Sequence, residues 1–372
     1  MINTTRLFAI TRKEAIQLRR DTKSLVLAFL LPIVLLLLLG YAITWDVEDI
    51  RTAVLDEDNS FRSRELIQAF RSAGYFRIES LLASPAEIAA ALERRDAEIV
   101  LVIPADFSAD LDAGRPAMLQ AILDGSDANT ASIILGYVQA IVATYAVEAR
   151  AGGVEIRPLI GVESRVWYNE ELKSRIMIVP GLIPVIMMII AAMLTSLTIA
   201  REWERGTMEQ LASTPVSRVE VVLGKLLPYL AIGFIDLIVA TAIGILLFKV
   251  PFRGSPVLLL AMSFFFLVGA LGLGMYISAV ARSQLLATQM ALVITFLPAY
   301  LLSGFMFSID VMPRALRLIS YLVPARYFLV VTRGIFLKGV GVEVLFLQGL
   351  FMVLFSIAGL TLAIRAFKKE LR

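Results

Sequence analysis

Six apolar stretches recur along the chain, each long enough to cross a membrane as a helix, which takes about 20 residues. They lie at residues 24–45, 176–200, 222–248, 257–280, 285–307 and 344–364. The first is too long for the apolar part of a signal peptide, and it ends with Tyr41 and Trp45, which is typical of an aromatic belt at a membrane interface. The pattern predicts a polytopic α-helical membrane protein with six transmembrane helices.

The long segment 46–175 has a different pattern. Short alternating apolar runs predict strands at 52–56, 75–80, 98–104, 118–124 and 154–162, and helical patterns fall between them at 60–73, 85–95 and 127–150. Alternation of strands and helices favours an α/β domain with at least one parallel strand pair. A segment of about 130 residues can bury its own core, so we expect an inserted folded domain rather than a linker.

The distribution of charge predicts the orientation. Basic residues flank both ends of the chain, before residue 24 and after residue 364, which indicates that both termini are cytoplasmic. Segment 46–175 carries 22 acidic and 13 basic residues, so it is expected to be extracytoplasmic. One loop conflicts with this assignment, because the external segment 309–343 is basic. Its cations are Arg314, Arg317, Arg326, Arg333 and Lys338.

Residues 1–23 have the pattern of an amphipathic helix. One arc of the helix carries apolar side chains and the opposite arc carries cations, with Ile16 as the exception. The two arcs are Leu7, Phe8, Ile10, Ala15 and Leu18 against Arg12, Lys13, Arg19, Arg20 and Lys23. This predicts a cytoplasmic interfacial helix whose cations face anionic lipid; the alternative is that the basic residues serve only as an orientation signal.

A compact polar hairpin, REWERGTMEQLASTPVSRVE, separates the second and third apolar stretches at 201–220. Gly206 can end the preceding helix in a left-handed conformation. Thr207 and Gln210 have the spacing of a capping box, and Pro215 ends the short helix because it excludes Thr214 from the helical region. Ser217 and Glu220 form a second capping box at the start of the next helix. We therefore expect a rigid short helix over 207–214 on the cytoplasmic side.

Composition removes several kinds of chemistry. The chain has no cysteine and no histidine, which excludes thiol nucleophiles, disulfides and imidazole metal ligands. Hydrophobic residues make up 58% of the chain and its mean hydropathy is +0.80, well above the apolar fraction of about 45–50% in soluble domains.

Several segments resemble the ABC-2 family of exporter permeases. They are REWERGTMEQLASTPVSRVEVVLGKLLPY at 201–228, LDEDNSFRSREL at 55–66, FKVPFRGS at 248–255 and LSGFMFSIDVMPRALRLISYLVPARYF at 302–328. Each motif is weak alone, but their number, order and spacing cover nearly the whole chain. The resemblance implies a permease of the bacterial inner (plasma) membrane that exports a hydrophobic or amphipathic, drug-like or lipid-like substrate. It also implies a dimer with a second copy or close homologue and, in Gram-negative bacteria, a periplasmic membrane-fusion protein.

The resemblance assigns roles to two segments. The hairpin would hold a coupling helix docked on an ATPase subunit, with Arg201, Glu202, Glu204, Gly206, Thr207, Glu209, Gln210, Leu211, Thr214 and Pro215 as its residues. Residues 309–335 would form an external re-entrant or amphipathic segment, marked by Pro313, Arg314, Pro324 and Arg326. Its arginines would then lie among outer lipid phosphates, which reduces the conflict between the basic residues of this segment and its predicted external location.

No GxxxxGK[ST] phosphate-binding loop occurs in the sequence, nor a cytoplasmic segment long enough for a nucleotide-binding domain. ATP and magnesium would therefore bind to a separate ATPase chain. We expect this chain to bind no cofactor or nucleic acid and to catalyse nothing alone.

Within the apolar stretches, Asp236 is the one acidic residue. A carboxylate in a membrane is by default functional, as a substrate contact, an inter-helix bond or a proton site, but it can equally be protonated and bonded to Thr241 or a neighbouring hydroxyl. Met187, Met188 and Phe296 could line a hydrophobic substrate pathway, although packing or lipid contact is the simpler interpretation. Small residues at 270, 274 and 278 predict a face for close helix packing.

Two alternatives remain. An ion-coupled secondary transporter would need several intramembrane ionisable groups or inverted repeats, and the sequence has one acid and no visible repeat. A membrane-anchored receptor or scaffold acting through its external domain would need few spans. An ABC exporter differs from both because it requires a stoichiometric ATPase partner.

Overall fold

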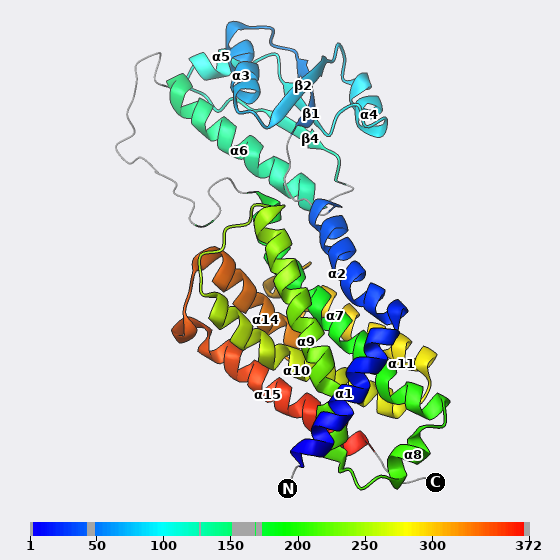
Figure 1. Cartoon of the computed structure of the whole chain (residues 1–372). Helices are drawn as coiled ribbons and strands as arrows, with labels where there is room; N and C mark the ends of the chain where they lie inside the picture. The colour runs from blue at the N-terminus through cyan, green and yellow to red at the C-terminus, as the bar shows by residue number, and fades with distance from the viewer. Residues whose placement is uncertain (1–2, 43–48, 126–127, 151–167, 169–172, 368–372) are drawn as a thin grey trace. The chain divides into compact units, whose positions relative to one another are not determined.

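The computed structural model describes residues 3–42, 49–125, 128–150, 168 and 173–367. The chain divides into two compact units, which are described separately (Figure 1). One unit is Trp45–Arg165, and the other combines Met1–Thr44 with Val166–Arg372.

The first unit contains a four-stranded sheet in the order β2-β1-β3-β4. Strand β1 is parallel to both β2 and β3, and β4 is antiparallel to β3. This confirms the predicted α/β domain with parallel strand pairs; the strand expected at 154–162 lies outside the described residues. The strands are β1 Ile50–Asp56, β2 Phe76–Leu81, β3 Ile99–Ile103 and β4 Gln120–Leu123, and the helices are α3 Phe61–Ser72, α4 Ala86–Glu93, α5 Phe107–Asp112 and α6 Ala128–Arg150.

Both faces of this sheet are covered, which explains why all five residues of β3 are buried. Leu66 and Phe70 of α3 pack on one face together with Ile134 of α6, and Ala91 of α4 packs on the other. Helix α6 is apolar enough over Thr130–Val147 to count as a seventh candidate span. Its buried stripe, however, belongs to the core of this unit.

The second unit contains the six predicted spans. Most ends of the observed helices lie within a few residues of the corresponding ends of the apolar stretches. They are α2 Thr22–Ala42, α7 Ser174–Glu204, α9 Arg218–Leu246, α10 Pro256–Ala281, the composite α11 Gln284–Ala291, η1 Leu292–Phe296 and α12 Leu297–Leu301, and α15 Val342–Ala366. In the composite fifth span, Pro298 has no N–H to offer the carbonyl of Ile294. The helix widens into the π-helical turn η1 at this point.

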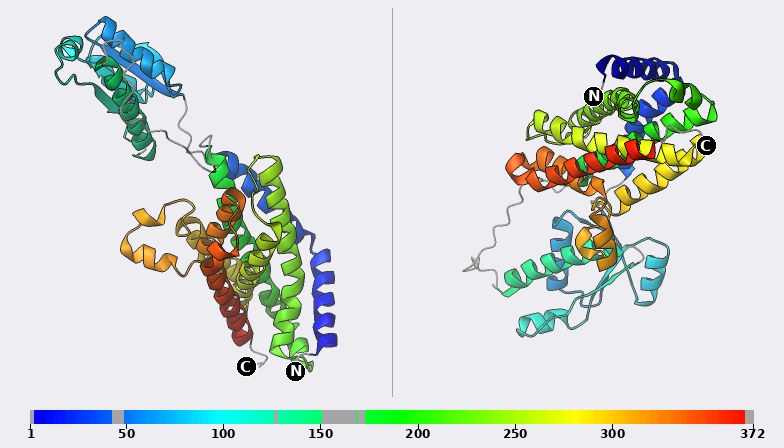
Figure 2. Two further views of the ribbon diagram at one scale, coloured as in Figure 1. Left: turned by 90° about the vertical axis from the view of Figure 1, so that its left-hand side faces the viewer. Right: turned by 90° about the horizontal axis from the view of Figure 1, so that it is seen from below.

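Shorter elements complete the helical unit. They are α1 Thr4–Arg20, α8 Met208–Ser213, η2 Ile309–Val311, α13 Arg314–Ser320, α14 Pro324–Arg333 and η3 Gly334–Lys338. Helices α1 and α8 and the last turns of α15 lie at the same end of the bundle (Figure 1 and Figure 2). Helix α1 packs along α9, where Gly224 leaves room for Ile10.

Helix α7 is the centre of the bundle, and it packs against α2, α9, α10, α11 and α14. Its contact with α10 is close because a Cβ added at Gly274 would lie 2.1 Å from Oγ1 of Thr195. Four residues further on, the Ser278 hydroxyl accepts hydrogen bonds from the amides of Ile199 and Ala200, at 3.0 and 2.8 Å. The small-residue face predicted on α10 is therefore a helix-packing surface.

Candidate functional site

The turn between α7 and α9 is built largely as the sequence predicts. Gly206 follows the end of α7 with φ of +69°, and the short helix α8 ends at Ser213, before Pro215. The amide of Glu220 donates to the Ser217 hydroxyl, while the Glu220 carboxylate accepts from the Ser217 amide at 2.8 Å, which completes the predicted capping box. Both ends of the connection are thus fixed by local hydrogen bonds.

The start of α1 is bonded to the same turn. The amide of Asn3 donates to Oε1 of Glu220 at 2.7 Å, and Nη1 of Arg6 donates to the carbonyl of Pro215. These contacts join residues more than 200 positions apart. The N-terminal helix is therefore part of the hairpin's immediate support.

Glu202 lies near the end of α7, just before the connection between α7 and α9, and only 5% of its side chain is exposed. Its Oε1 accepts from Nζ of Lys13 at 2.9 Å and from Nζ of Lys225 at 3.3 Å. Its other carboxylate oxygen accepts a hydrogen bond from the hydroxyl of Thr207. One carboxylate thereby connects α1, α7, α9 and the residue that precedes α8.

Lys225 of α9 extends this network back to α1. Its Nζ also donates to Oε2 of Glu14 at 2.9 Å, and the Tyr229 hydroxyl donates to the other oxygen of Glu14 at 3.2 Å. The side chains of Glu14 and Lys225 are each 2% exposed. A buried charge is tolerated when it is paired and hydrogen-bonded, and here two lysines face two glutamates, so the network is neutral as a whole.

Two further contacts surround the buried ion network, which comprises Lys13, Glu14, Glu202 and Lys225. Arg201 donates to Oδ2 of Asp21 at 2.8 Å, linking α7 to the connection between α1 and α2. Burial raises the pKa of Asp21, but hydrogen bonds from Ser24 and the charge of Arg201 outweigh it and hold the pKa below its usual value. Glu204 is exposed, and its carboxylate accepts from the amide of Gln284 at the start of α11 at 2.7 Å.

The structure adds contacts that the sequence analysis did not predict. The Thr207 hydroxyl donates to the Glu202 carboxylate; because a hydroxyl can also accept, its predicted capping of α8 stays a prediction. Glu202 is buried among the chain's own residues, and its role in coupling to a partner stays a prediction. Lys13, expected to face lipid, pairs with Glu202.

Of the remaining hairpin residues, Gln210, Thr214 and Pro215 are exposed. The side chains of Glu209 and Leu211 lie outside the described part of the structure. The roles assigned to all of these residues in binding a partner stay predictions.

The residues suggested for a substrate pathway lie in different surroundings, and their role in transport stays a prediction. Met187 and Met188 are each 2% exposed inside the packed centre of α7, and Phe296 stacks on Tyr300 with ring centroids 5.5 Å apart. Asp236 is buried, but its Oδ2 and the Oγ1 of Thr241 each lack a hydrogen-bond partner among the described residues. The predicted bond between Asp236 and Thr241 is therefore absent.

The segment after the fifth span forms a sharply bent helix pair. Helices α13 and α14, the latter continued by η3, meet at 77°. Pro313 directly precedes α13, and Pro324 is the first residue of α14, a position where a missing N–H costs nothing. This geometry fits a broken span or a re-entrant loop, as expected for 309–335. Arg314 is exposed, whereas Arg326 stacks on Tyr321 at 4.0 Å.

Sequence reasoning missed Glu14, Lys225 and Tyr229 as members of the network. A faint signal was present, because Glu14 is the one acid in an otherwise basic helix and Lys225 is a cation inside a predicted span. Their pairing depends on how α1 packs on α9, which no local pattern reveals.

Comparison with known proteins places the whole chain in one family. The model of the ABC-2 family transporter protein matches residues 23–365. The Probable multidrug ABC transporter permease YbhS of Escherichia coli (strain K12) is 37% identical over 94% of this chain and 93% of its own length. The Probable multidrug ABC transporter permease YbhR of the same strain is 34% identical over 91% and 92%, and its Inner membrane transport permease YhhJ is 27% identical over 86% and 85%. The chain therefore belongs to the ABC-2 family of transporter permeases.

Proposed function

We propose that this multi-pass permease exports a hydrophobic or amphipathic compound, using ATP hydrolysed by a separate ATPase subunit of the kind with which ABC-2 permeases work. Two copies, or this chain and a close homologue, would pair with two ATPases in the bacterial inner membrane, with both termini cytoplasmic. A periplasmic membrane-fusion protein would complete the exporter in a Gram-negative cell. The names of YbhS and YbhR support a multidrug type of substrate.

The buried ion network carries the mechanistic part of this proposal. Helix α8 lies between two long spans, its residues Gln210 and Ser213 are exposed, and it would be the element that contacts a cytoplasmic partner. Movement of α8 would reach Glu202 through the adjacent Thr207. From Glu202 it would pass to α9 through Lys225 and on to α1 through Glu14. Because these three side chains are buried, separating their charges costs several kcal/mol, so the three helices would move together.

A substitution at Glu202 tests the mechanism. Glu202→Gln keeps the shape of the side chain but removes both ion pairs, whereas Glu93→Gln changes an exposed carboxylate of α4, outside the hairpin. The variants would be co-expressed with the ATPase subunit and reconstituted in liposomes, with co-purification, ATP hydrolysis and export measured on each.

We expect the ATPase to co-purify with both variants. Export should fall about tenfold or more with Glu202→Gln, since tenfold corresponds to only about 1.4 kcal/mol, and should stay within about twofold with Glu93→Gln. Normal export by Glu202→Gln would refute transmission through the network. Failure of the wild-type chain to bind any ATPase would refute the proposed function itself.

A further inference from the structure

Arg333, the last residue of α14, forms no ion pair with the described residues, and as a whole its side chain is half-buried. Its Nε and Nη2 are buried, and neither has a hydrogen-bond partner among the described residues. A guanidinium has five N–H donors and stays charged, and leaving its buried donors unpaired is costly. Two donors that face the protein interior without a partner in the described part of the chain point to a ligand.

Two other arginines of the same segment each have a hydrogen-bond partner within the chain. Nη2 of Arg317 donates to the carbonyl of Asp310 at 2.5 Å, which leaves only its Nε unpaired and buried. Nη1 of Arg326 donates to the hydroxyl of Ser320 at 2.5 Å, and its guanidinium stacks on Tyr321. The segment thus pairs arginines where it can, and Arg333 is the exception among these three.

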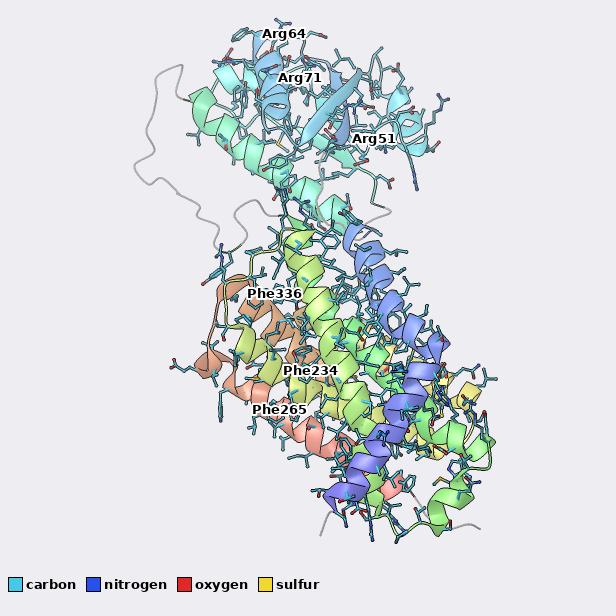
Figure 3. The ribbon with its side chains drawn as sticks, in the orientation of Figure 1. Arg51, Arg64, Arg71, Phe234, Phe265 and Phe336 are labelled. Carbon is cyan, nitrogen blue, oxygen red and sulfur yellow. The ribbon has the colours of Figure 1, made fainter. Side chains whose placement is uncertain are left out.

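The surroundings of Arg333 explain why it is unpaired. Its guanidinium lies against Gly181 of α7, where an added Cβ would be 2.9 Å from Nη2 and 2.9 Å from Cδ2 of Phe305. A glycine and an aromatic ring offer the cation space but no carboxylate. The site is far from the buried ion network, because Gly181 lies in the first turns of α7 and Glu202 in its last turns. Figure 3 shows Phe336, three residues after Arg333, in the half of the bundle opposite α8.

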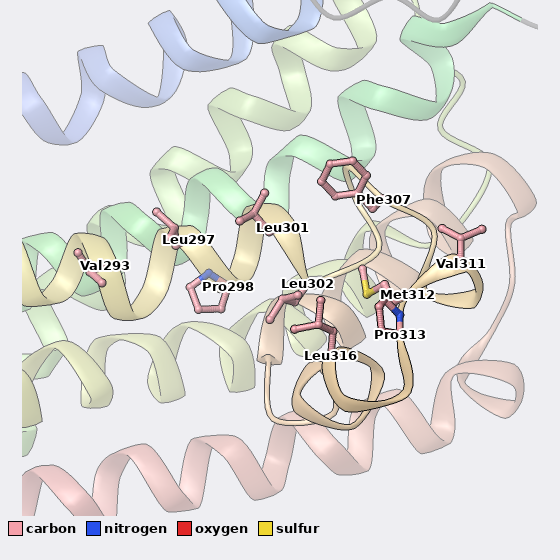
Figure 4. Close-up of a pocket in the computed structure, with 10 residues that line it drawn as sticks. All are labelled: Val293, Leu297, Pro298, Leu301, Leu302, Phe307, Val311, Met312, Pro313 and Leu316. Atoms are coloured by element: carbon pink, nitrogen blue, oxygen red, sulfur yellow. The ribbon is translucent and has the colours of Figure 1, made fainter. Parts of the chain in front are cut away.

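An apolar cavity of about 550 Å³ opens beside the same loop. Val293, Leu297 and Leu301 line it from the fifth span, and Leu302, Phe307 and Leu316 line it from the loop and α13 (Figure 4). Leu302 and Phe307 belong to the cavity, while Phe305 between them packs beside Arg333. One short loop therefore separates an unpaired cation from a space suited to hydrocarbon, and a volume of this size is typical of small-molecule sites.

We propose that Arg333 and this cavity form a binding site for an anionic amphiphile, with a phosphate, sulfonate or carboxylate group on Arg333 and a hydrocarbon chain in the cavity. Such a group accepts charge-assisted hydrogen bonds from a guanidinium, often two at once. The occupant is either a resident membrane lipid or the exported compound, which share this chemistry. The second of these rests on the proposed export function.

Binding to the purified full-length chain tests the site without ATP. The delipidated protein in neutral detergent would be titrated with decyl phosphate, decyl maltoside, decyltrimethylammonium and inorganic phosphate, with calorimetry as the readout. The wild-type chain should bind decyl phosphate in preference to the other three probes, because only decyl phosphate supplies both the anion and the chain.

Three variants locate the site. Arg333→Gln should weaken binding of decyl phosphate about 10- to 100-fold, the loss expected for a hydrogen bond to a charged group. Arg326→Gln, which removes a neighbouring arginine that is already paired, should leave it within about twofold. Leu297→Trp, which fills the cavity and keeps the charge, should also weaken it, and this variant serves if Arg333→Gln does not fold.

Equal binding of all probes by the wild-type chain, or unchanged binding by Arg333→Gln and Leu297→Trp, would overturn the proposal. Equal binding of all four probes is also the result expected if an acidic residue of a second copy of the chain paired with Arg333. Phosphorus content of the protein before delipidation separates the two occupants. A lower lipid content in Arg333→Gln identifies a resident lipid, and an unchanged content identifies an exchangeable ligand. Because no step of this binding experiment uses ATP, its failure would not contradict the proposed export function. Failure of the export experiment would likewise not contradict the proposed binding site.

Discussion

Removing the cation at the centre of the buried ion network should be among the most destabilising single changes in the bundle. Lys225→Met keeps the length of the side chain but leaves Glu14 with the Tyr229 hydroxyl as its one remaining polar partner in the network. Glu14 and Lys225 are each 2% exposed, so solvent does not screen their interaction. Breaking such a pair from one side costs about 3–5 kcal/mol.

The double variant distinguishes the net contribution of the ion pair to the free energy of unfolding from the cost of leaving one buried charge unpaired. Glu14→Gln with Lys225→Met removes both charges, and replacing a buried pair with neutral groups of similar volume is often close to neutral. We therefore expect the double variant to recover about 2 kcal/mol or more of the loss, within the range of coupling found for residues in contact. Lys13→Met is the matched control, since the side chain of Lys13 is 54% exposed and its pair with Glu202 should contribute about 1 kcal/mol or less.

Unfolding of the detergent-solubilised full-length chain, followed by differential scanning fluorimetry and by denaturant titration, measures these differences. A loss of under about 1 kcal/mol for Lys225→Met would show that water reaches the site, which contradicts the burial on which the reasoning depends. A double variant no more stable than the single one would show that Glu14 and Lys225 do not act as a pair.

Three further outcomes follow from the packing. Gly274→Ala should destabilise the contact between α7 and α10 by about 1–3 kcal/mol, because the new Cβ would lie 2.1 Å from the Thr195 hydroxyl; Gly136→Ala, in open space on α6, should be neutral or stabilising in the same melting assay. Ser217→Ala should cost about 1 kcal/mol through loss of the capping box, and an unchanged melting temperature would contradict its role. Asp21→Asn should lower stability at neutral pH. The pKa of Asp21 is lowered in the folded state, so its contribution is present above about pH 4 and disappears as the pH falls through the lower folded value; a difference from wild type that persists in acid would exclude this cause.

The elements of the fold were largely predictable because hydrophobic spacing is a local property. The six long helices follow from apolar length alone, and the parallel strands follow from short alternating runs separated by helices. Helix α5 was missed because six residues contain too little periodicity to stand out. The π-helical turn η1 follows from Pro298 only once the helix around it is known, so the sequence pattern alone does not reveal it.

The chemistry of the hairpin was predictable in part. Gly206, Pro215 and the box at Ser217 act on their own neighbours, and all three occur as expected. The hydrogen bond from the Thr207 hydroxyl to Glu202 was not predicted, because the acceptor lies in the preceding helix. The partners of Glu202 come from residues 13 and 225, and only the three-dimensional packing of α1 on α9 brings them together.

The buried ion network and the surroundings of Arg333 both include residues of helix α7. Helix α7 holds Glu202 near one end and Gly181, which faces Arg333, near the other. At about 1.5 Å per residue they lie about 31 Å apart along the axis. A shift of α8 that moves Glu202 would therefore reach the Arg333 site through α7 without any chain of intervening polar contacts. Pro180 and Pro184 sit on either side of Gly181, and each removes one helical hydrogen bond there. Prolines thus interrupt the hydrogen bonding of α7 beside the proposed site for an anionic amphiphile and not beside the buried ion network, so we expect α7 to bend more easily at the first of these places.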